Sequence, residues 1–543
     1  MKKIFGVCIG SCIHVAGILN FLTTAKRAGY ETKFSGTAVN IDDLVEEIIV
    51  YIPDIVAISY RLSPESITPL FDQLKKKIKE VSMLKDIEFI LGTTKPVAEI
   101  AKKTGIFKKI FTGQDDNLEV EAYLKEEKID MEEKMPPGEL LERIEYNKPF
   151  PLIRHHFGRP TLKETLKGIK VISKSRILDV ISIGPDQNTQ EFFFNSRKMD
   201  PKQDGAGGVP LRSENDFKKL FQASRTGNFP LMRCYSGTND ILRMAKILYD
   251  TIDNAWCAVP LLWYNVLDNR SNRKLIESIS ENQSVMKWHG LNNIPVEVNE
   301  SHHWSLRYAP DAVGVAAAYL AAYCAKKMGV RTYVSQYMFN TPPETSFAMD
   351  LAKMLAKIEL IESLHDRTFE SIRETRAGLF SYPLDFDESK GQLASSTMLQ
   401  MQIDPKIVHI VGYCEADHAA TPNDIIESTK IGKRVIENCI YGCPDMKQDY
   451  KVQLRKQELL TEAMLIIEKI KSLDKERTYQ DPLISPQILA MAVEKGILDA
   501  PHLNGVKAAK GTIITVFEDG KNYSADNNLK PVTEEQRLDG ISI

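Results

Sequence analysis

A histidine in a glycine-flanked loop is the residue of this chain best suited to bind a metal ion. The loop reads Gly10-Ser11-Cys12-Ile13-His14-Val15-Ala16-Gly17 and follows the first apolar run. A neutral imidazole nitrogen is a good transition-metal ligand, and its basicity depends on what accepts the other ring proton. Cys12 can accept that proton only weakly. Gly10 gives the turn conformational freedom, and Gly17 lets the loop approach a flat ligand closely. On these residues alone, an ordinary loop histidine is the favoured interpretation of His14, and metal ligation is the alternative.

The elements around this loop alternate between strands and helices over residues 1–125. Strands are expected at the apolar runs Ile4–Ile9, Glu31–Phe34, Ile55–Ser59 and Ile87–Leu91. Helices are expected at Ile18–Ala28, Asp42–Tyr51, Ile67–Val81 and Val97–Thr104. This alternation implies an α/β domain with a parallel, doubly wound, flavodoxin-like sheet, in which ligands bind at the carboxyl ends of the strands. The segments that follow these strands, and that we therefore expect at one edge, are the His14 loop, Ser59–Leu62 and Gly92–Thr94.

The His14 loop resembles the Asp-x-His-x-x-Gly signature of base-off cobalamin-binding domains, with Cys12 in place of the aspartate. In that family the histidine replaces the cofactor's dimethylbenzimidazole as the lower cobalt ligand. The order of elements is similar to that of the small subunit of glutamate mutase. The resemblance implies that Ser59 contacts the nucleotide tail and that Gly92 borders it. The cofactor-binding residues that it implies are Cys12, His14, Gly17, Ser59, Leu62, Gly92 and Thr93, with His14 as the metal ligand.

The composition is that of an ordinary globular protein large enough for two or three domains. The chain has 543 residues, of which 43% are apolar and 26% charged, and these fractions argue against disorder. The net charge of −3 gives no reason to expect nucleic acid or an anionic membrane as a partner. No apolar run reaches the roughly 18 residues that span a bilayer. Eight dispersed cysteines suit a reducing compartment, so we expect a cytoplasmic protein.

The remainder of the chain predicts a linker, a barrel and a small lobe. Residues 126–150 are charged and indicate a polar, partly helical linker after a cofactor domain at 1–125. Residues 151–475 repeat strand–helix units, which fit a (β/α)8 TIM barrel better than a second open sheet. Residues 476–543 are expected to form a C-terminal lobe. The barrel strand candidates are Val180–Ile183, Leu231–Cys234, Ala255–Leu262, Val296–Val298, Thr332–Gln336 and Ile407–Val411.

The barrel segment resembles the large catalytic subunit of glutamate mutase. The shared motifs are a strand ending at Arg233 before a Gly-Thr-Asn helix start, Trp263-Tyr264-Asn265, and a Glu-Ala-Asp-His-Ala-Ala-Thr-Pro run beginning at Glu415. The resemblance implies that Arg233 binds a substrate carboxylate and that Tyr264 hydrogen-bonds the substrate. It implies that Glu415 contacts the adenosyl ribose of the cofactor. These are the expected catalytic residues, and Glu415 is also a cofactor contact.

Departures from that family argue against glutamate as the substrate. The segment Asp186–Gln190 has no arginine near the second position of the family's three-arginine clamp. Ala258 falls where the family has the glutamate that meets the substrate amine, and Gly412 falls near its ribose lysine. We therefore expect a smaller or singly charged acid. Two purely structural interpretations also stay open: Arg233 could form a structural ion pair, and Tyr264 could be a core aromatic.

Two histidine-containing segments after expected strands also have more than one interpretation. His302-His303 either caps the barrel mouth or lies on a surface loop. Glu415, Asp417 and His418 could form a carboxylate–histidine cluster for a metal, although neighbours in sequence at a strand end rarely converge on one ion.

The resemblances together imply an adenosylcobalamin-dependent radical isomerase, similar to a carbon-skeleton mutase that fuses the two subunits. Homolysis of the cobalt–carbon bond would give a 5′-deoxyadenosyl radical that abstracts a substrate hydrogen. A corrinoid methyltransferase using methylcobalamin is the second hypothesis, because it uses the same His14 loop. A cobalamin carrier or sensor is the third, which a barrel of this size disfavours. We expect a small-molecule acid as substrate, and barrel mutases often pair, which implies a homodimer.

Overall fold

A computed structural model of the chain describes residues 2–113, 120, 123–124 and 135–542. It divides into two compact units, Met1–Lys134 and Met135–Ile543, each with its own hydrophobic core. The boundary residues 125–134, which include the first part of the predicted linker, lie outside the described residues. Among the described residues, none of the helices combines the length and the apolar character that crossing a bilayer requires.

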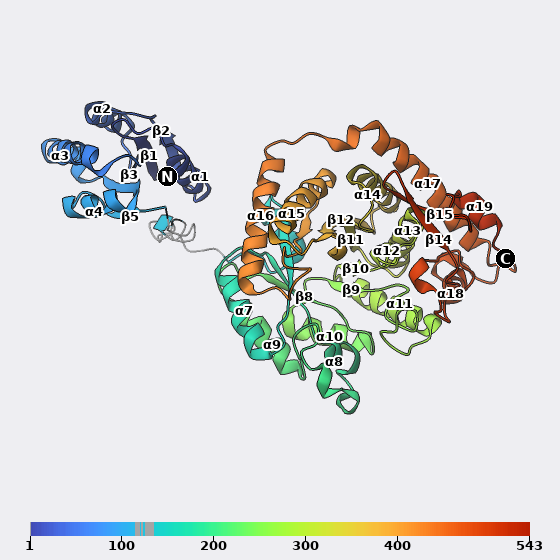
Figure 1. Cartoon of the computed structure of the whole chain (residues 1–543). Coiled ribbons are helices and arrows are strands. Elements are labelled where there is room, and N and C mark those ends of the chain that lie inside the picture. The colour runs from blue at the N-terminus through green and yellow to red at the C-terminus, as the bar shows by residue number, and fades with distance from the viewer. Residues whose placement is uncertain (1, 114–119, 121–122, 125–134, 543) are drawn as a thin grey trace. The chain divides into compact units, whose positions relative to one another are not determined.

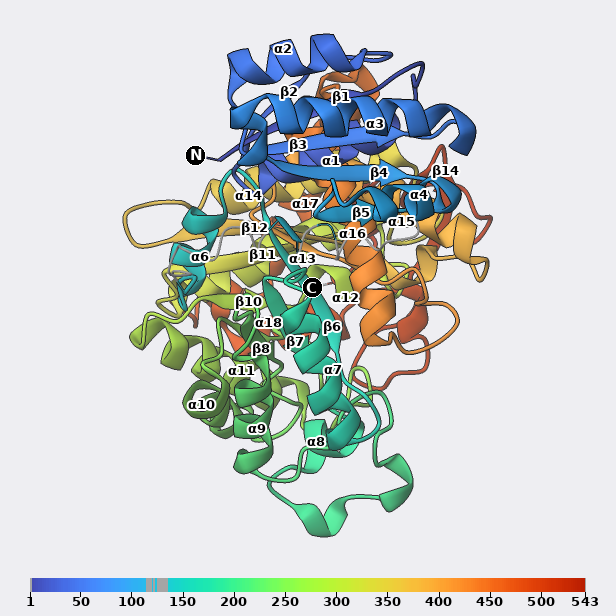
Figure 2. The ribbon, with the colours of Figure 1, turned by 90° about the vertical axis from the view of Figure 1, so that its left-hand side faces the viewer.

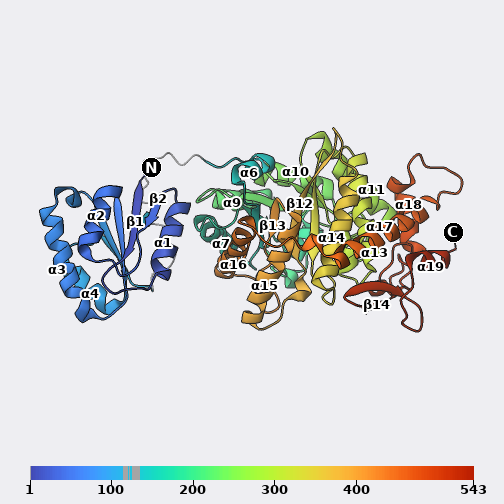
Figure 3. The same ribbon diagram turned by 90° about the horizontal axis from the view of Figure 1, so that it is seen from above.

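The first unit is a five-stranded parallel sheet with the strand order β2-β1-β3-β4-β5 (Figure 1). This order is that of a flavodoxin-like doubly wound fold, so the prediction of this fold is confirmed. Helix α1 covers one face of the sheet, and α2, α3 and α4 cover the other (Figure 3). Figure 2 views the unit from the side of α3. The strands are β1 (Lys3–Cys8), β2 (Glu31–Phe34), β3 (Ile55–Tyr60), β4 (Glu88–Thr93) and β5 (Lys109–Phe111), and the helices are α1 (Ala16–Arg27), α2 (Ile41–Tyr51), α3 (Pro64–Glu80) and α4 (Lys95–Thr104).

Burial explains the central strands of this sheet, and capping explains its second helix. Every residue of β3 is buried, as expected for a parallel strand covered on both faces. Helix α2 begins after Asn40, whose side chain accepts a hydrogen bond from the backbone N–H of Asp43. Because β1, β3 and β4 pair in parallel, their carboxyl ends meet at one edge of the sheet, where the His14 loop begins.

The second unit is a parallel barrel whose eight strands neighbour one another in chain order (Figure 1). The ladder is open only between the third and fourth barrel strands, β8 and β9, among the residues described. The predicted TIM-barrel class is confirmed. The strands are β6 (Leu152–Phe157), β7 (Val180–Ile183), β8 (Leu231–Cys234), β9 (Cys257–Val259), β10 (Val296–Val298), β11 (Thr332–Phe339), β12 (Glu370–Ala377) and β13 (Ile407–His409).

Helices surround the barrel and close its amino end. Helix α6 (Leu140–Asn147) falls in the segment predicted as a partly helical linker. Its Leu140 and Ile144 pack against the first residues of the barrel strands, so this part of the segment belongs to the second unit. The helices that follow are α7 (Leu162–Lys174), α8 (Gln187–Phe192), α9 (Glu214–Ser224), α10 (Ile241–Ile252), α11 (Leu275–Leu291), α12 (Ser301–Ser305), α13 (Asp311–Lys327), α14 (Phe347–Glu362), α15 (Phe386–Gln400), α16 (Pro422–Ile440) and α17 (Tyr450–Lys471).

The C-terminal residues share a core with the barrel helices. They form α18 (Pro486–Glu494), the hairpin of β14 (Ile514–Glu518) and β15 (Lys521–Ala525), and α19 (Glu534–Asp539). Ile488 and Val493 of α18 lie in the same buried cluster as residues of α13, α14 and α17. The predicted boundary at residue 475 therefore falls inside one continuous core.

Charged side chains fill the middle of the barrel. Arg154 of β6 pairs with Glu374 of β12 and, at 3.5 Å, with Glu297 of β10. Glu297 also accepts hydrogen bonds from Trp256 Nε1 at 2.7 Å and from Gln336 Nε2 at 2.7 Å. Since buried charges are tolerated only when they are paired, this network fixes the strands that contribute to it.

Candidate functional site

Hydrogen bonds fix the backbone of the His14 loop, and the side chain of His14 is exposed to solvent. Gly10 has φ +64°, the left-handed conformation that its prediction as a turn residue requires. The carbonyl of His14 accepts hydrogen bonds from Ser59 Oγ at 3.3 Å and from Cys8 Sγ at 3.7 Å. Cys12 Sγ lies 3.7 Å from His14 Nδ1. His14 is exposed, and no described residue makes a hydrogen bond to its Nε2, so this nitrogen is available as a potential ligand.

A cleft of about 250 Å³ opens between α1 and the carboxyl ends of β3, β4 and β5. Gly17, Ser59, Gly92 and Thr93 line it, together with Phe21, Arg61 and Phe111 among others. A Cβ built on Gly17 would meet nothing within 4 Å, and one on Gly92 would approach only the carbonyl of Ile58, at 3.9 Å. The two glycines therefore keep open a space that any side chain would begin to fill.

The structure brings most of the predicted cofactor residues of the first unit together. Cys12 and His14 lie on the loop, and Ser59 links that loop to the cleft through its hydrogen bond to His14. Leu62 is the exception, because it packs against the hydrophobic core instead of lining the cleft. These positions fit the expected sites, and the binding roles of the residues stay predictions.

A second and larger pocket, of about 770 Å³, lies at the carboxyl ends of the barrel strands. This is the end at which TIM-barrel enzymes carry their active sites. Tyr264 and Glu415 line this pocket, as expected from the sequence. The histidines that line it are His155 and His156 from β6, His302 and His303 from α12, and His409 from β13.

The pocket histidines are neutral imidazoles. Burial lowers the pKa of His155 to about 4, and burial together with nearby arginines lowers the pKa of His156, His303 and His409 well below the ordinary value. His155 Nε2, His303 Nε2 and His409 Nδ1 are buried and have no hydrogen-bond partner in the described structure. Unpartnered buried nitrogens of this kind are available to a bound molecule. The sequence placed His302-His303 either at the barrel mouth or on a surface loop, and the structure shows the mouth.

Tyr264 is held in an uncommon backbone conformation. Its φ is +67°, which is rare for a residue with a bulky side chain. Arg273 Nη2 and Ser271 Oγ donate hydrogen bonds to its carbonyl at 2.8 and 2.9 Å, and its N–H donates to Asp268. The ring faces the pocket beneath the guanidinium of Arg270, which lies 4.6 Å from the ring centroid. Tyr264 is therefore a pocket residue and not only a core aromatic.

Two side chains of opposite charge, Glu415 and Arg376, both line the pocket. Partial exclusion of water raises the pKa of Glu415, and the positive charge of Arg376 opposes that shift. Arg376 is the last residue but one of strand β12, and its side chain makes a single described hydrogen bond, from Nε to the carbonyl of Ala377 at 3.3 Å. Its terminal nitrogens are thus available to an anionic ligand. Arg270 adds a second guanidinium to the pocket lining.

Arg233 lies below the pocket and is absent from its lining. It is fully buried, its Nη2 contacts Glu297 Oε2 at 2.5 Å, and its guanidinium lies 4.8 Å from the ring centroid of Tyr235. Tyr235 lines the pocket in its place. The structural ion pair, the alternative interpretation from the sequence, describes this geometry. Arg233 Nε and Nη1 have no hydrogen-bond partner among the described residues, and carboxylate binding by Arg233 stays a prediction.

Several residues of the two sites were missed by sequence reasoning. Arg61 lies in the segment Ser59–Leu62 that was expected at the edge but was not singled out as a contact. Arg376 and His409 lie at the carboxyl ends of their strands, so position at a strand end was the available signal. Arg270 lies on a long loop with no motif that marks it. His155 and His156 lie in a strand that was not predicted.

Comparisons with known proteins give only distant similarities. No protein-family model matches the chain, and neither does any curated protein. A solved cobalamin-binding protein from Desulfitobacterium hafniense DCB-2 is 18% identical, with a TM-score of 0.21. The match covers 24% of this chain and 59% of that one, so the chain spans little more than half of that protein's length.

Two further solved structures match larger parts of the chain. The 2,3-dimethylmalate lyase of the PEP mutase/isocitrate lyase superfamily is 10% identical over 61% of this chain and 96% of its own, with a TM-score of 0.27. The cobalamin-dependent S-adenosylmethionine radical enzyme OxsB is 10% identical over 92% of this chain and 73% of its own, with a TM-score of 0.19. At these TM-scores the similarities carry no argument about activity, which must rest on the residues themselves.

Proposed function

We propose that the first unit binds a corrinoid through His14 and that the barrel is the catalytic part of an adenosylcobalamin-dependent radical isomerase. The observation that carries the proposal is the exposed His14 ring beside an open cleft lined by Gly17, Ser59 and Gly92. A histidine ligand needs one free ring nitrogen and a neighbour that orients the other. Nε2 is free, and Cys12 lies at Nδ1.

The cleft fits the elongated tail of such a cofactor better than a compact ion. It is lined by α1 on one side and by three strand ends on the other, with the aromatic rings of Phe21 and Phe111 6.0 Å apart. Ser59 and Thr93 supply hydroxyl groups, and Arg61 supplies a cation for a phosphate in the tail. The two glycines leave the width that a ring system requires.

In the barrel, the proposed substrate is a small carboxylic or amino acid. Arg376 would hold its carboxylate, because a guanidinium can donate two parallel hydrogen bonds to that group. Arg270 and Tyr264 would close the other side of the pocket. The neutral histidines would hydrogen-bond the remaining polar atoms of the substrate without adding charge.

When bound, adenosylcobalamin supplies a carbon radical by homolysis of its weak cobalt–carbon bond. The residues of this chain would have to keep water away from that chemistry and hold the substrate in one orientation. Glu415 is proposed to position the adenosyl group, since its side chain lines the pocket and a carboxyl group can accept hydrogen bonds from a ribose. A pocket of about 770 Å³ whose lining includes histidines, two arginines and Glu415 supports an enzyme over a cofactor carrier or sensor.

Reconstitution of the full-length chain tests this function. The chain is incubated with adenosylcobalamin or methylcobalamin, and optical and electron paramagnetic resonance spectra are recorded while small acids are screened. A radical signal that depends on both adenosylcobalamin and one acid supports the isomerase. Methyl transfer from methylcobalamin to an acceptor, with no radical signal, would instead establish the methyltransferase.

A further inference from the structure

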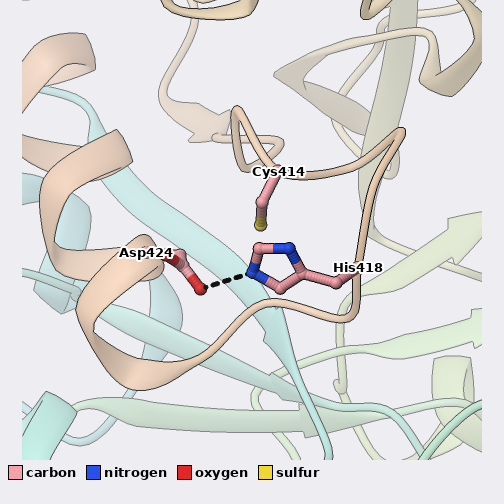
Figure 4. A group of neighbouring side chains, drawn as sticks. All are labelled: Cys414, His418 and Asp424. Carbon is pink, nitrogen blue, oxygen red and sulfur yellow. Dashed lines mark hydrogen bonds and ion pairs between the residues drawn. The ribbon is translucent and has the colours of Figure 1, made fainter. Parts of the chain in front are cut away.

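Three potential metal ligands converge on the loop between β13 and α16. Cys414, His418 and Asp424 each offer one ligand atom, and these atoms lie within 4.8 Å of one another. Figure 4 shows the sulfur of Cys414 and the carboxylate of Asp424 on two sides of the His418 ring. The cluster differs from the one considered from the sequence, because Glu415 lines the barrel pocket and does not join it.

The spacing of these atoms suits a tetrahedral divalent ion. His418 Nε2 and Asp424 Oδ2 are 3.1 Å apart. Zinc bonds to nitrogen and oxygen of about 2.0–2.1 Å place two ligands of a tetrahedron about 3.3 Å apart. The other ring nitrogen, His418 Nδ1, lies 2.6 Å from Asp417 Oδ2. Metal-bound histidines typically donate their second N–H to a carboxylate, as His418 can to Asp417.

Helix capping accounts for only part of this arrangement. Asp424 belongs to the capping box of α16. Its Oδ2, the oxygen that also contacts His418, accepts hydrogen bonds from the N–H and Oγ1 of Thr421 at 2.8 and 2.7 Å, and its Oδ1 accepts one from Tyr413 at 3.1 Å. Its contact with His418 could be an ordinary ion pair. Cys414 has no place in that explanation. It is 1% exposed, and no other residue in the described part of the chain hydrogen-bonds to its sulfur, which points at the His418 ring (Figure 4).

We propose that Cys414 Sγ, His418 Nε2 and Asp424 Oδ2 bind one zinc ion, with water in the fourth position. A thiolate, an imidazole and a carboxylate together form a ligand set that zinc accepts. Cys414, His418 and Asp424 do not line the barrel pocket, so the ion would not contact the substrate. The zinc ion would join the segment after β13 to the start of α16. It would thereby fix the loop between them, which contributes Glu415, Ala419 and Ala420 to the pocket lining. Asp417 would be a positioning residue for His418.

The test measures zinc in the full-length chain without corrinoid, so its outcome is independent of the proposed function. After equilibrium dialysis against zinc, mass spectrometry should find one ion per chain. Cys414→Ser and His418→Gln should lose it, whereas Cys443→Ser and His365→Gln, which alter a cysteine and a histidine outside the cluster, should retain it. Asp417→Asn should weaken zinc affinity about 10- to 100-fold.

Cobalt(II) provides a readout that does not depend on the variants' stability. When Co²⁺ replaces zinc in the wild-type chain, the Cys414 ligand should produce a thiolate-to-cobalt absorption band in the near ultraviolet. Competition by zinc should remove the band. A wild-type chain that binds no zinc and shows no such band would overturn the proposal, as would full retention of both in Cys414→Ser.

Discussion

At the scale of single residues, the account depends on one free imidazole nitrogen and on two positions without a side chain. Cys12 lies where the related signature has aspartate, and its sulfur is 3.7 Å from His14 Nδ1. A sulfur is a weaker acceptor than a carboxylate, so the His14 ring should be held less firmly than in a carboxylate-supported site. The space at Gly17 and Gly92 is the more direct test, because it can be filled without disturbing the fold.

Gly92→Val and Gly17→Leu should each abolish corrinoid binding. Both side chains would project into the cleft, where a Cβ meets no atom closer than 3.9 Å. We expect affinity to fall about a hundredfold or more, which corresponds to about 2.7 kcal/mol. Titration followed by the visible absorption of the corrinoid measures this change.

Stability and an outside glycine serve as controls for these variants. Gly17 lies in the first turn of α1, so leucine should stabilise the helix by about 0.8 kcal/mol through its higher propensity. Gly391→Leu, in the exposed part of α15 where a Cβ also meets nothing, should leave corrinoid affinity unchanged. Tight binding by a folded Gly92→Val protein would show that the cofactor does not use this cleft.

The two arginines of the barrel should separate substrate binding from stability. Arg376→Gln should lower kcat/KM for the acid substrate about 10- to 100-fold, the loss expected for a charge-assisted hydrogen bond. Its effect on unfolding should be small, since Arg376 makes a single described hydrogen bond. Arg233→Gln should instead lower the free energy of unfolding by about 3–5 kcal/mol, because it leaves Glu297 buried without its main partner.

Steady-state kinetics and denaturant unfolding of both variants check this division. The account would be contradicted if Arg233→Gln kept its stability while its KM rose sharply, because that would return the carboxylate contact to Arg233.

At the scale of elements, the sequence predicted the strands with apolar faces and missed the strands with charged ones. The runs at β1, β3 and β7 are almost uniformly apolar and buried, so their pattern indicated a parallel sheet. β6 and β12 were missed because they carry buried arginines, histidines and glutamates. The partners that make these charges tolerable, such as Arg154 and Glu374, are 220 residues apart in the sequence.

The candidate sites divide in the same way. The His14 loop, Ser59 and Gly92 were found because each lies at or just after the carboxyl end of a recognisable strand. Arg376 and His155 were missed because recognising them requires β12 and β6, and Arg270 because no local pattern fixes the loop that carries it. Arg233 was found as a strand-end arginine, but its depth in the barrel depends on Glu297 and Trp256, which are distant in sequence.

His155, in the first barrel strand β6, should make the free energy of unfolding of the second unit depend on pH. The folded pKa of His155 is lowered from 6.5 to about 4 by burial. Between these values the unfolded chain binds more protons, so the contribution of His155 is complete above its unfolded pKa and is lost as the pH falls towards 4. From about pH 7 to about pH 4.5 this loss is about 2.5 kcal/mol.

Denaturant unfolding of the wild type and His155→Gln at both pH values measures this contribution. The variant should lose about 2.5 kcal/mol less on acidification, since other titrating groups are common to both proteins. His365→Gln, at an exposed position on the loop before β12, should follow the wild type. Equal acid sensitivity of wild type and His155→Gln would contradict the neutral, buried state of this histidine.

At the scale of the whole molecule, the chain consists of two units that each have a complete core. The proposed corrinoid-binding residues lie in the first unit, and the substrate pocket, with the proposed adenosyl contact Glu415, lies in the second. A ligand that binds only a folded unit stabilises that unit by mass action.

Calorimetry should therefore show two unfolding transitions that respond to different ligands. Methylcobalamin, which lacks the adenosyl group, should at about a hundred times its Kd stabilise only the transition of the first unit, by about 2.7 kcal/mol. The acid substrate alone should shift only the transition of the barrel. If a corrinoid raised only the unfolding temperature of the barrel, its binding site would lie in the second unit, and this result would contradict the proposal.

The most direct test of the central claim identifies the atom that ligates cobalt. The chain is produced with ¹⁴N- or ¹⁵N-labelled histidine, reconstituted with corrinoid and reduced to the Co(II) state for electron paramagnetic resonance. If His14 Nε2 is the lower ligand, each cobalt line is split into three by ¹⁴N and into two by ¹⁵N. His14→Ala should lose this histidine-dependent splitting, and His365→Ala should keep it. Splitting that does not change with the histidine label, or that persists in His14→Ala, would contradict the account.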